Sequence, residues 1–353
     1  MTDLLARLAI DAPIIQAPMA GISTPAMAAA VAEAGALGSI AVGATDAAGA
    51  RRMIADVRAL STRSLAVNVF CHRPAIARPA VERAWLDRLR PELARYGAAP
   101  PAALREIYTS FVEDDAMLAA LVELRPRVVS FHFGVPPADR IAALRSAGIA
   151  LLGTATSLGE ARLLVDAGVD AVVAQGFEAG GHRGAFDPDA PDDQLGTLAL
   201  TRLLVRSLGI PVIAAGGIMD GAGIAAAMRL GAAAAQLGTA FVACPESAAD
   251  AGYRAALAGD AAHHTTITRA ISGRPARCLA NRFTALGAAI APRDIPDYPI
   301  AYDAGKALAA AARAAGEPGY GAHWAGQGAP LARALPAGEL VRVLRAELEQ
   351  ACS

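Results

Sequence analysis

Short apolar runs alternate along the chain with alanine-rich amphipathic stretches. The runs are six to nine residues of mostly Ala, Val, Ile and Leu, and several end in Gly. Apolar segments of this length, bounded by turn residues, are typical of buried β-strands. Eight such segments predict strands, over residues 13–19, 37–43, 65–70, 128–134, 150–156, 171–177, 211–217 and 233–241.

The stretches between these runs have a helical pattern. Several open with Thr, Ser or Asp and close on Gly, the residues that cap helices at their two ends. The clearest predict helices over 24–35, 46–60, 137–148, 157–168 and 220–231. Eight strand and helix units in series favour a closed parallel (β/α)8 TIM barrel over an open doubly wound sheet.

Two segments do not fit the repeat, residues 71–126 and 244–353. The first has helical patterns over 81–97 and 102–126, and the second mixes helical stretches with segments rich in Pro and Gly. Both follow predicted strands, so they emerge at the end of the barrel where active sites lie. We therefore predict a barrel from 1–70 and 127–243, and a mainly helical cap from 71–126 and 244–353 that forms the substrate pocket. The alternative is that the tail continues the outer helical ring.

Composition restricts the class of protein. The 353 residues exceed the length of an ordinary barrel, about 250, by roughly 100. The net charge is −1 and basic residues are not clustered, which argues against nucleic acid as a partner. No apolar run approaches the roughly 20 residues of a membrane helix, and the first residues lack a signal-peptide pattern. The four cysteines are widely spaced, unlike a metal site. We expect a cytoplasmic protein with a small-molecule ligand.

Two glycine-rich turns follow the seventh and eighth predicted strands, over 214–224 and 236–241. Barrels commonly hold a phosphate group there, because backbone N–H groups at tight turns are fixed donors. Gly216, Gly217, Gly238 and Thr239 fit this role. A single such turn would indicate only a connection, whereas two at these strands favour a phosphate-bearing ligand.

Lone amides interrupt four of the apolar strands, at Gln16, Asn68, Gln175 and Gln236. A buried amide needs hydrogen-bond partners, either from the neighbouring backbone or from a ligand. Four at similar depth suggest a ring with alternating donors and acceptors, such as a flavin.

The segment GFEAGGHRG, residues 176–184, places His182 just past a predicted strand. Flanking glycines allow the backbone to approach a ligand closely. Histidine there can act as a base or as a hydrogen-bond donor near neutral pH. The alternative is a solvated loop histidine.

The segment YPIAYDAGKA, residues 298–307, contains Lys306, the only lysine of the chain. A helix beginning near Pro299 would place Tyr302 and Lys306 on one face, with Tyr298 at its start. A compact ammonium suits an anionic substrate, although an accidental surface lysine is the alternative. Tyr108 and His132 are further candidates for the same pocket.

Five segments together resemble the signature blocks of the class I nitronate monooxygenases, formerly called 2-nitropropane dioxygenases. They occur in order and span most of the chain, over residues 13–38, 65–70, 169–186, 216–241 and 298–308.

The resemblance implies non-covalent FMN and oxidation of alkyl nitronates, such as propionate 3-nitronate, by O2 to a carbonyl compound and nitrite through an anionic flavosemiquinone. It makes His182 the catalytic base for neutral nitroalkanes, and gives a positive environment from His182 and Lys306. Its implied FMN contacts are Ala17, Pro18, Met19, Asn68, Gln175, Gly180, Gly181, Gly217, Gln236, Leu237, Gly238 and Thr239. Its implied substrate contacts are Tyr108, His132, Tyr298, Tyr302 and Lys306.

A second enzyme class stays open, an NAD(P)H-dependent FMN reductase of quinones or enoyl thioesters on the same fold. A flavin-binding protein without turnover is a third. We expect a monomer or a weak homodimer, without a nucleic-acid or membrane partner.

Overall fold

Eight parallel strands form the centre of the protein, in a computed structural model that describes residues 4–353. The first three residues of the predicted barrel segment lie outside that part. Each of the eight predicted runs contains one strand. They are β1 (Ile14–Gln16), β2 (Gly38–Ala41), β3 (Leu65–Phe70), β4 (Val128–His132), β5 (Ala150–Ala155), β6 (Ala171–Gln175), β8 (Val212–Ala215) and β9 (Ala234–Leu237).

The sheet closes on itself. Its order is β1-β9-β8-β6-β5-β4-β3-β2. The edges β1 and β2 meet where the Leu37 amide donates to the Ile14 carbonyl and the Gln16 amide donates to the Leu37 carbonyl, each at 3.0 Å. The (β/α)8 barrel predicted from the repeat is therefore confirmed.

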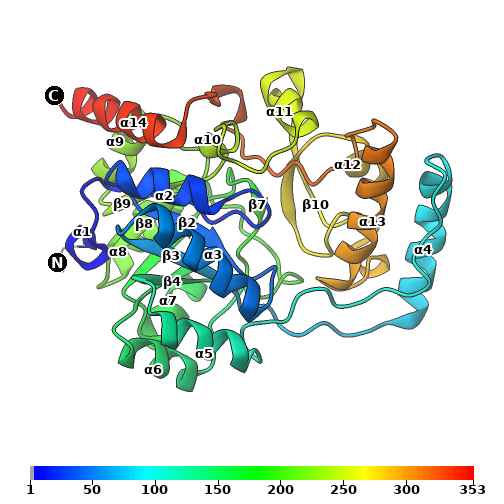
Figure 1. Cartoon of the computed structure of the whole chain (residues 1–353), viewed down its shortest axis with the longest axis horizontal. Helices are drawn as coiled ribbons and strands as arrows, with labels where there is room; N and C mark the ends of the chain where they lie inside the picture. Colours follow the sequence, from blue (N-terminus) through cyan, green and yellow to red (C-terminus); the bar gives the residue numbers. More distant parts are fainter. Residues whose placement is uncertain (1–3) are drawn as a thin grey trace.

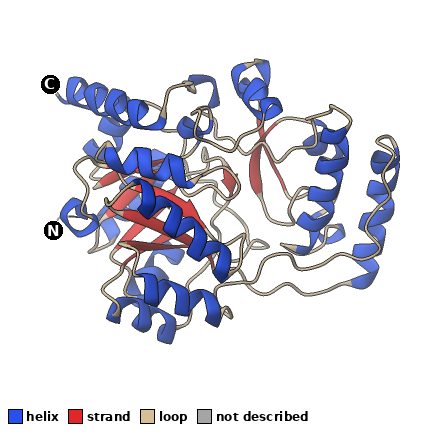
Figure 2. Cartoon of the chain, viewed as in Figure 1, coloured by secondary structure: helices blue, strands red, loops and turns tan. Residues whose placement is uncertain are grey.

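Helices surround this barrel (Figures 1 and 2). Side chains predicted to cap them do so: Thr24 accepts from the Met27 amide, and Asp220 accepts from the Gly223 amide. The helices around the barrel are α2 (Pro25–Glu33), α3 (Ala47–Leu60), α5 (Asp115–Leu124), α6 (Ala138–Ser146), α7 (Leu158–Ala167), α8 (Thr197–Ser207), α9 (Gly221–Arg229) and α14 (Ala337–Cys352).

Two of these helices come from segments predicted to belong to the cap. Helix α14 lies against α2 and α9, and its Leu340 and Leu344 are buried in one cluster with Met27 and Ile224 (Figure 1). Helix α5 likewise contacts α3 and α6. Helix α14 therefore packs as part of the outer helical ring, which is the alternative given above for the tail.

The helix predicted over 102–126 forms only in its second half. Asp114 accepts a hydrogen bond from the Met117 amide at 2.9 Å and so caps α5 at its start. Residues 102–114 instead pass beside the carboxyl end of β3, where the Phe111 amide donates to the Phe70 carbonyl. The prediction was wrong there because this tertiary contact and the Asp cap outweigh the local helical pattern.

Most of the rest of the two segments lies to the right of the barrel in Figure 1, and we call this part the cap. Its apolar core contains Trp85, Phe283 and Leu308, all fully buried. Its elements are α4 (Pro79–Ala94), α12 (Arg282–Gly287), α13 (Ile300–Ala314), β10 (Thr265–Thr268) and β11 (Ala276–Leu279). Three shorter helices complete the chain, α1 (Leu4–Leu8), α10 (Thr239–Val242) and α11 (Ala251–Ala258).

One short strand joins barrel and cap. Strand β7 (Gly181–His182) follows β6 in the chain, yet it pairs antiparallel with β11, in the order β10-β11-β7. His182 is opposite Ala276, and the next amide, that of Arg183, donates to the Pro275 carbonyl at 2.9 Å. His182 therefore lies at the junction of the two parts.

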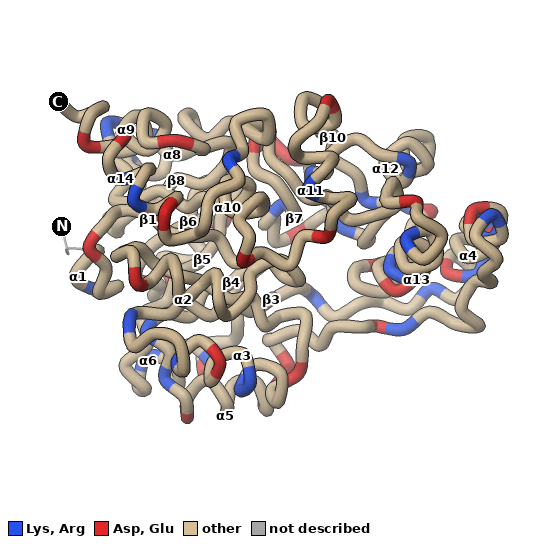
Figure 3. The backbone as a smooth tube through the Cα atoms, turned by 45° about the horizontal axis from the view of Figure 1, so that its top comes forward, with Lys and Arg blue, Asp and Glu red and all other residues tan. Residues whose placement is uncertain are grey.

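Acidic and basic residues are interspersed over barrel and cap (Figure 3). Across residues 4–353, every helix is too short or too polar to cross a lipid bilayer.

Candidate active site

A cavity of about 760 Å³ lies at the carboxyl ends of the barrel strands, next to the cap. Every residue that the family resemblance implies for the site lines it. They are Ala17, Pro18, Met19, Asn68, Tyr108, His132, Gln175, Gly180, Gly181, His182, Gly217, Gln236, Leu237, Gly238, Thr239, Tyr298, Tyr302 and Lys306. The structure brings these side chains together; their individual roles stay predictions.

The four strand amides differ in how they are used. Gln16 is fully buried and does not line the cavity: it donates to the Ser23 hydroxyl and accepts from the Ser39 amide, each at 2.9 Å. It is therefore a structural residue, as the alternative interpretation had it. Gln175 is satisfied by backbone, donating to the His182 carbonyl at 3.0 Å and accepting from the Gly184 amide at 2.7 Å.

Asn68 and Gln236 keep free polar atoms at the cavity. The side-chain nitrogen of Asn68, Nδ2, donates to Ser130, and its side-chain oxygen, Oδ1, has no donor in the described part of the chain. The Gln236 side chain makes no hydrogen bond among the same residues, although it is partly buried. Two of the four amides are thus available to a ligand.

Backbone donors gather at the turns after β8 and β9. The amides of Gly217 and Gly238 donate to no acceptor within residues 4–353, and both residues line the cavity. Gly217 has a φ of +69°, in the left-handed region that favours glycine. Unpaired N–H groups at the edge of a cavity suit the oxygens of a phosphate.

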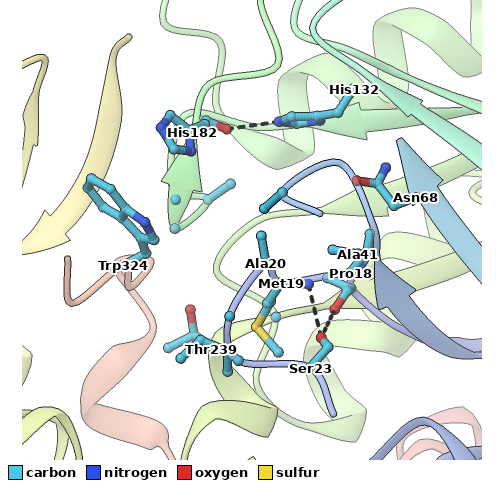
Figure 4. A pocket seen from close by; sticks show the side chains of 18 of the residues that line it. Pro18, Met19, Ala20, Ser23, Ala41, Asn68, His132, His182, Thr239 and Trp324 are labelled. Carbon is cyan, nitrogen blue, oxygen red and sulfur yellow. Dashed lines mark hydrogen bonds between the residues drawn. The ribbon is translucent and has the colours of Figure 1, made fainter. Parts of the chain in front are cut away.

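The loop after β1 forms another wall. The Ser23 hydroxyl accepts from the Met19 amide at 2.9 Å, which folds the backbone of Pro18 and Met19 toward the cavity (Figure 4).

His182 faces the same cavity, with the Trp324 ring beside it (Figure 4). Its carbonyl accepts from Gln175 and, at 3.2 Å, from the His132 ring. Its Nε2 lies 2.8 Å from the Ser272 hydroxyl, while Nδ1 has no hydrogen bond in the described residues. The ring centroid of Trp324 is 5.1 Å away. One ring nitrogen is therefore held and the other is available.

The His182 imidazole is neutral at pH 7. Burial, with smaller contributions from the nearby His132 and Arg274, lowers its pKa to about 3. Burial also lowers the pKa of His132 to about 4. The expected positive environment thus does not come from His182. The cations nearby are Lys306, which lines the cavity, and Arg274, which lies against the Phe133 ring and whose pKa is lowered by burial to about 10.

Lys306 meets two tyrosine rings at the edge of the cavity. Its Nζ lies 5.0 Å from the ring centroid of Tyr108 and 5.3 Å from that of Tyr302, so the predicted shared face of α13 is confirmed. Burial lowers its pKa. Lys306 has no ion pair with any residue between 4 and 353, which leaves its charge for a ligand.

Sequence reasoning did not identify Trp324, Ser272 or Arg274. Trp324 lies in the Gly-rich tail, and Ser272 and Arg274 precede β11, so none of them follows a barrel strand. The close packing of the tail did leave a signal at Gly180: a Cβ there would be 2.4 Å from the Gly326 amide nitrogen. Among the described residues, no group of three or more His, Cys, Asp or Glu is placed to hold a metal ion.

Comparison with known proteins places this site in a family. The pattern of the nitronate monooxygenase family matches residues 2–347. A nitronate monooxygenase of Paraburkholderia phytofirmans is 65% identical over 347 residues, which cover 98% of this chain and 95% of that protein. One of Pseudomonas aeruginosa is 56% identical and covers 99% of each chain.

Solved structures agree. Nitroalkane oxidase from Streptomyces ansochromogenes superposes with a TM-score of 0.91 at 43% identity, over 99% of each chain. FabK from Thermotoga maritima superposes with a TM-score of 0.73 at 29% identity, over 100% of this chain and 97% of that one. The profile match and the two close relatives show that the chain belongs to the nitronate monooxygenase family of oxidoreductases.

Proposed function

We propose that the cavity binds FMN and that the protein oxidises alkyl nitronates, such as propionate 3-nitronate, with O2 to a carbonyl compound and nitrite. One observation supports this most: a neutral histidine with one free ring nitrogen faces a cavity that is lined by unpaired backbone donors and an unpaired lysine. The names of the two bacterial relatives supply the nitronate as the substrate class.

The residues present fit FMN. The unpaired amides of Gly217 and Gly238 suit its phosphate, and the free amide atoms of Asn68 and Gln236 suit the polar edge of its ring. A cavity of about 760 Å³ is in the range of about 300–1,000 Å³ that small-molecule sites occupy. When bound, FMN would supply the redox chemistry, accepting electrons from the nitronate and passing them to O2.

The protein's own part is to bind, orient and shelter the substrate. Lys306 would attract an anionic nitronate and contact the carboxylate of propionate 3-nitronate, because its ammonium is not paired with an acid. Trp324, Tyr298 and Phe133 surround the His182 ring at centroid distances of 5.1, 5.4 and 5.6 Å. These rings exclude water and so strengthen electrostatic contacts within the site.

His182 would act in two ways. A neutral nitroalkane must lose its α-proton, and Nδ1 is free to accept it while Ser272 holds Nε2. A nitronate has already lost that proton, so for it the ring acts as a hydrogen-bonding group. Because the pKa of His182 is about 3, the ring is in its proton-accepting form across neutral pH.

The competing function is reduction of the flavin by NADH or NADPH. The proposal is tested by mixing the FMN-loaded protein with each nucleotide in the absence of O2 and following the flavin absorbance. We expect the oxidised spectrum to persist. Rapid bleaching would favour the reductase and contradict a monooxygenase that needs no nicotinamide. A protein that binds FMN but neither bleaches nor releases nitrite from ethylnitronate in air would be a flavin carrier.

A further inference from the structure

A second cavity, of about 680 Å³, lies beside the first and shares Tyr298 with it. We call it the arginine cleft after the five arginines that line it, Arg73, Arg78, Arg269, Arg274 and Arg293. Its acidic lining consists of Asp187, Asp189 and Asp297, which leaves an excess of two positive charges in a chain of net charge −1.

Some arginines of the cleft form ion pairs with its aspartates and others do not. Arg78 lies 3.0 Å from Asp297, and Arg269 lies 2.7 Å from Asp189. The same Asp189 is 4.0 Å from Arg73. Two of the three acids are therefore already engaged by the outer arginines, and neither is within ion-pair distance of Arg274.

Arg274 is the buried member of the cleft. It is 3% exposed, and its guanidinium lies 4.3 Å from the Phe133 ring centroid and donates to the Ala185 carbonyl. Its Nε has no hydrogen-bond partner, and within residues 4–353 no carboxylate lies close enough to form an ion pair with it. Buried arginines are almost always paired with an acid, because an unpaired buried charge is costly.

Tyr298 forms the wall between the two cavities. It is 5% exposed, and its hydroxyl also lacks a hydrogen-bond partner in the part of the chain that the structure describes. Its ring lies 5.4 Å from the His182 ring by centroids. A buried cation and a buried hydroxyl, both with unused donors, thus adjoin a cleft with excess positive charge.

We propose that the arginine cleft binds a small oxyanion, of the carboxylate or nitrite type, with the Arg274 guanidinium as its innermost contact. A planar oxyanion accepts hydrogen bonds in the geometry that a guanidinium offers, and it would neutralise the charge that the protein leaves unpaired. The identification of the occupant as nitrite, released in the first cavity, rests on the proposed function. The proposal of an oxyanion site does not depend on that function.

The site also couples to the first cavity through charge. Arg274 is one of the groups that lower the pKa of His72, His132 and His182. An anion beside Arg274 offsets this charge, so binding in the cleft favours protonation of the three histidines.

The test is calorimetric titration of the full-length protein with sodium acetate and with sodium nitrite, at a fixed chloride concentration. We expect binding that weakens at least about tenfold in Arg274→Gln, because a charge-assisted contact is lost. A double variant, Arg73→Gln with Arg293→Gln, changes only exposed side chains and is expected to weaken binding about threefold by reducing the local positive potential. Arg345→Gln, on α14, is the matched control and binds as the parent does.

Unchanged affinity in a folded Arg274→Gln would overturn the proposal, as would the absence of binding by either anion at about 100 mM, far above the Kd expected of a specific site. Should Arg274→Gln not fold, unchanged affinity in the double variant overturns it instead. Loss of binding in Lys306→Met would also overturn it, because the anion would then occupy the first cavity. Tighter binding of acetate than of nitrite supports the site with a carboxylate occupant, and the reverse supports a nitrite occupant. Anion binding in a protein that releases no nitrite from ethylnitronate supports the cleft while refuting the proposed function.

Discussion

His72 is a fully buried histidine, and neither of its ring nitrogens makes a well-formed hydrogen bond within the described residues. Its ring packs edge-on against Tyr298, at 5.0 Å between centroids, and lies 6.4 Å from Phe133. Burial and, to a lesser extent, the charge of Arg274 lower its pKa from the ordinary 6.5 to about 4, against a smaller opposing interaction with the Tyr108 backbone. Replacement by Phe keeps an aromatic ring of similar shape and removes the titration.

The size of the effect follows from the two pKa values. The unfolded chain binds a proton at His72 near pH 6.5, whereas the folded chain binds it only near pH 4. The contribution of neutral His72 to the free energy of unfolding is therefore fully present above pH 6.5 and is lost as the pH falls toward 4. For this one group the loss between pH 8 and pH 5 is about 2 kcal/mol. His72→Phe removes that loss, and it also removes two unsatisfied nitrogens, which stabilises the protein by about 1 kcal/mol or more at any pH.

Urea unfolding at pH 5 and pH 8 measures this. The stability difference between His72→Phe and the parent is expected to be about 2 kcal/mol larger at pH 5 than at pH 8. His263→Gln, at an exposed position, is the control for the loss of one histidine. An equal difference at the two pH values would refute the reasoning, because it would show that His72 titrates alike in both states.

Three further predictions concern the proposed site. His182→Asn retains FMN and lowers turnover of nitroethane by about 100-fold or more, but lowers that of ethylnitronate much less, in nitrite assays; equal losses would contradict the base role. Ser272→Ala removes the hydrogen bond to the His182 ring and lowers kcat for nitroethane about 5-fold relative to kcat for ethylnitronate, with FMN affinity unchanged. If the ratio of the two kcat values stayed the same, Ser272 would not be a positioning residue. Lys306→Met raises KM for propionate 3-nitronate about tenfold more than for ethylnitronate, and an unchanged KM would exclude Lys306 from the substrate contacts.

Most of the barrel could be predicted because its signal is local. Apolar runs and capping residues recur with each unit, and all eight strands formed where the pattern placed them. Except for residues 65–70, the predicted strands were too long at their carboxyl ends. Ala17 to Met19, Gly216 with Gly217, and Gly238 with Thr239 leave the sheet to line the cavity. These residues look like strand in the sequence because they are small and apolar.

The cap could be predicted only in part because its contacts are distant in sequence. Nothing near His182 shows that its strand pairs with Ala276, or that Trp324 lies beside its ring. Likewise, an arginine such as Arg274 looks like any other until its burial and missing acid are seen. The Gln16 amide was misjudged for the same reason, since its partner Ser23 is provided by the fold of the following loop.

The central claim is that this cavity oxidises nitronates with FMN and O2. Its most direct test is nitrite release and O2 uptake when the FMN-loaded protein meets propionate 3-nitronate in air, without NADH or NADPH. We expect nitrite formation over many turnovers that stops when O2 is removed and that is absent from FMN alone. A fully FMN-loaded protein that forms no nitrite above the FMN blank would contradict it.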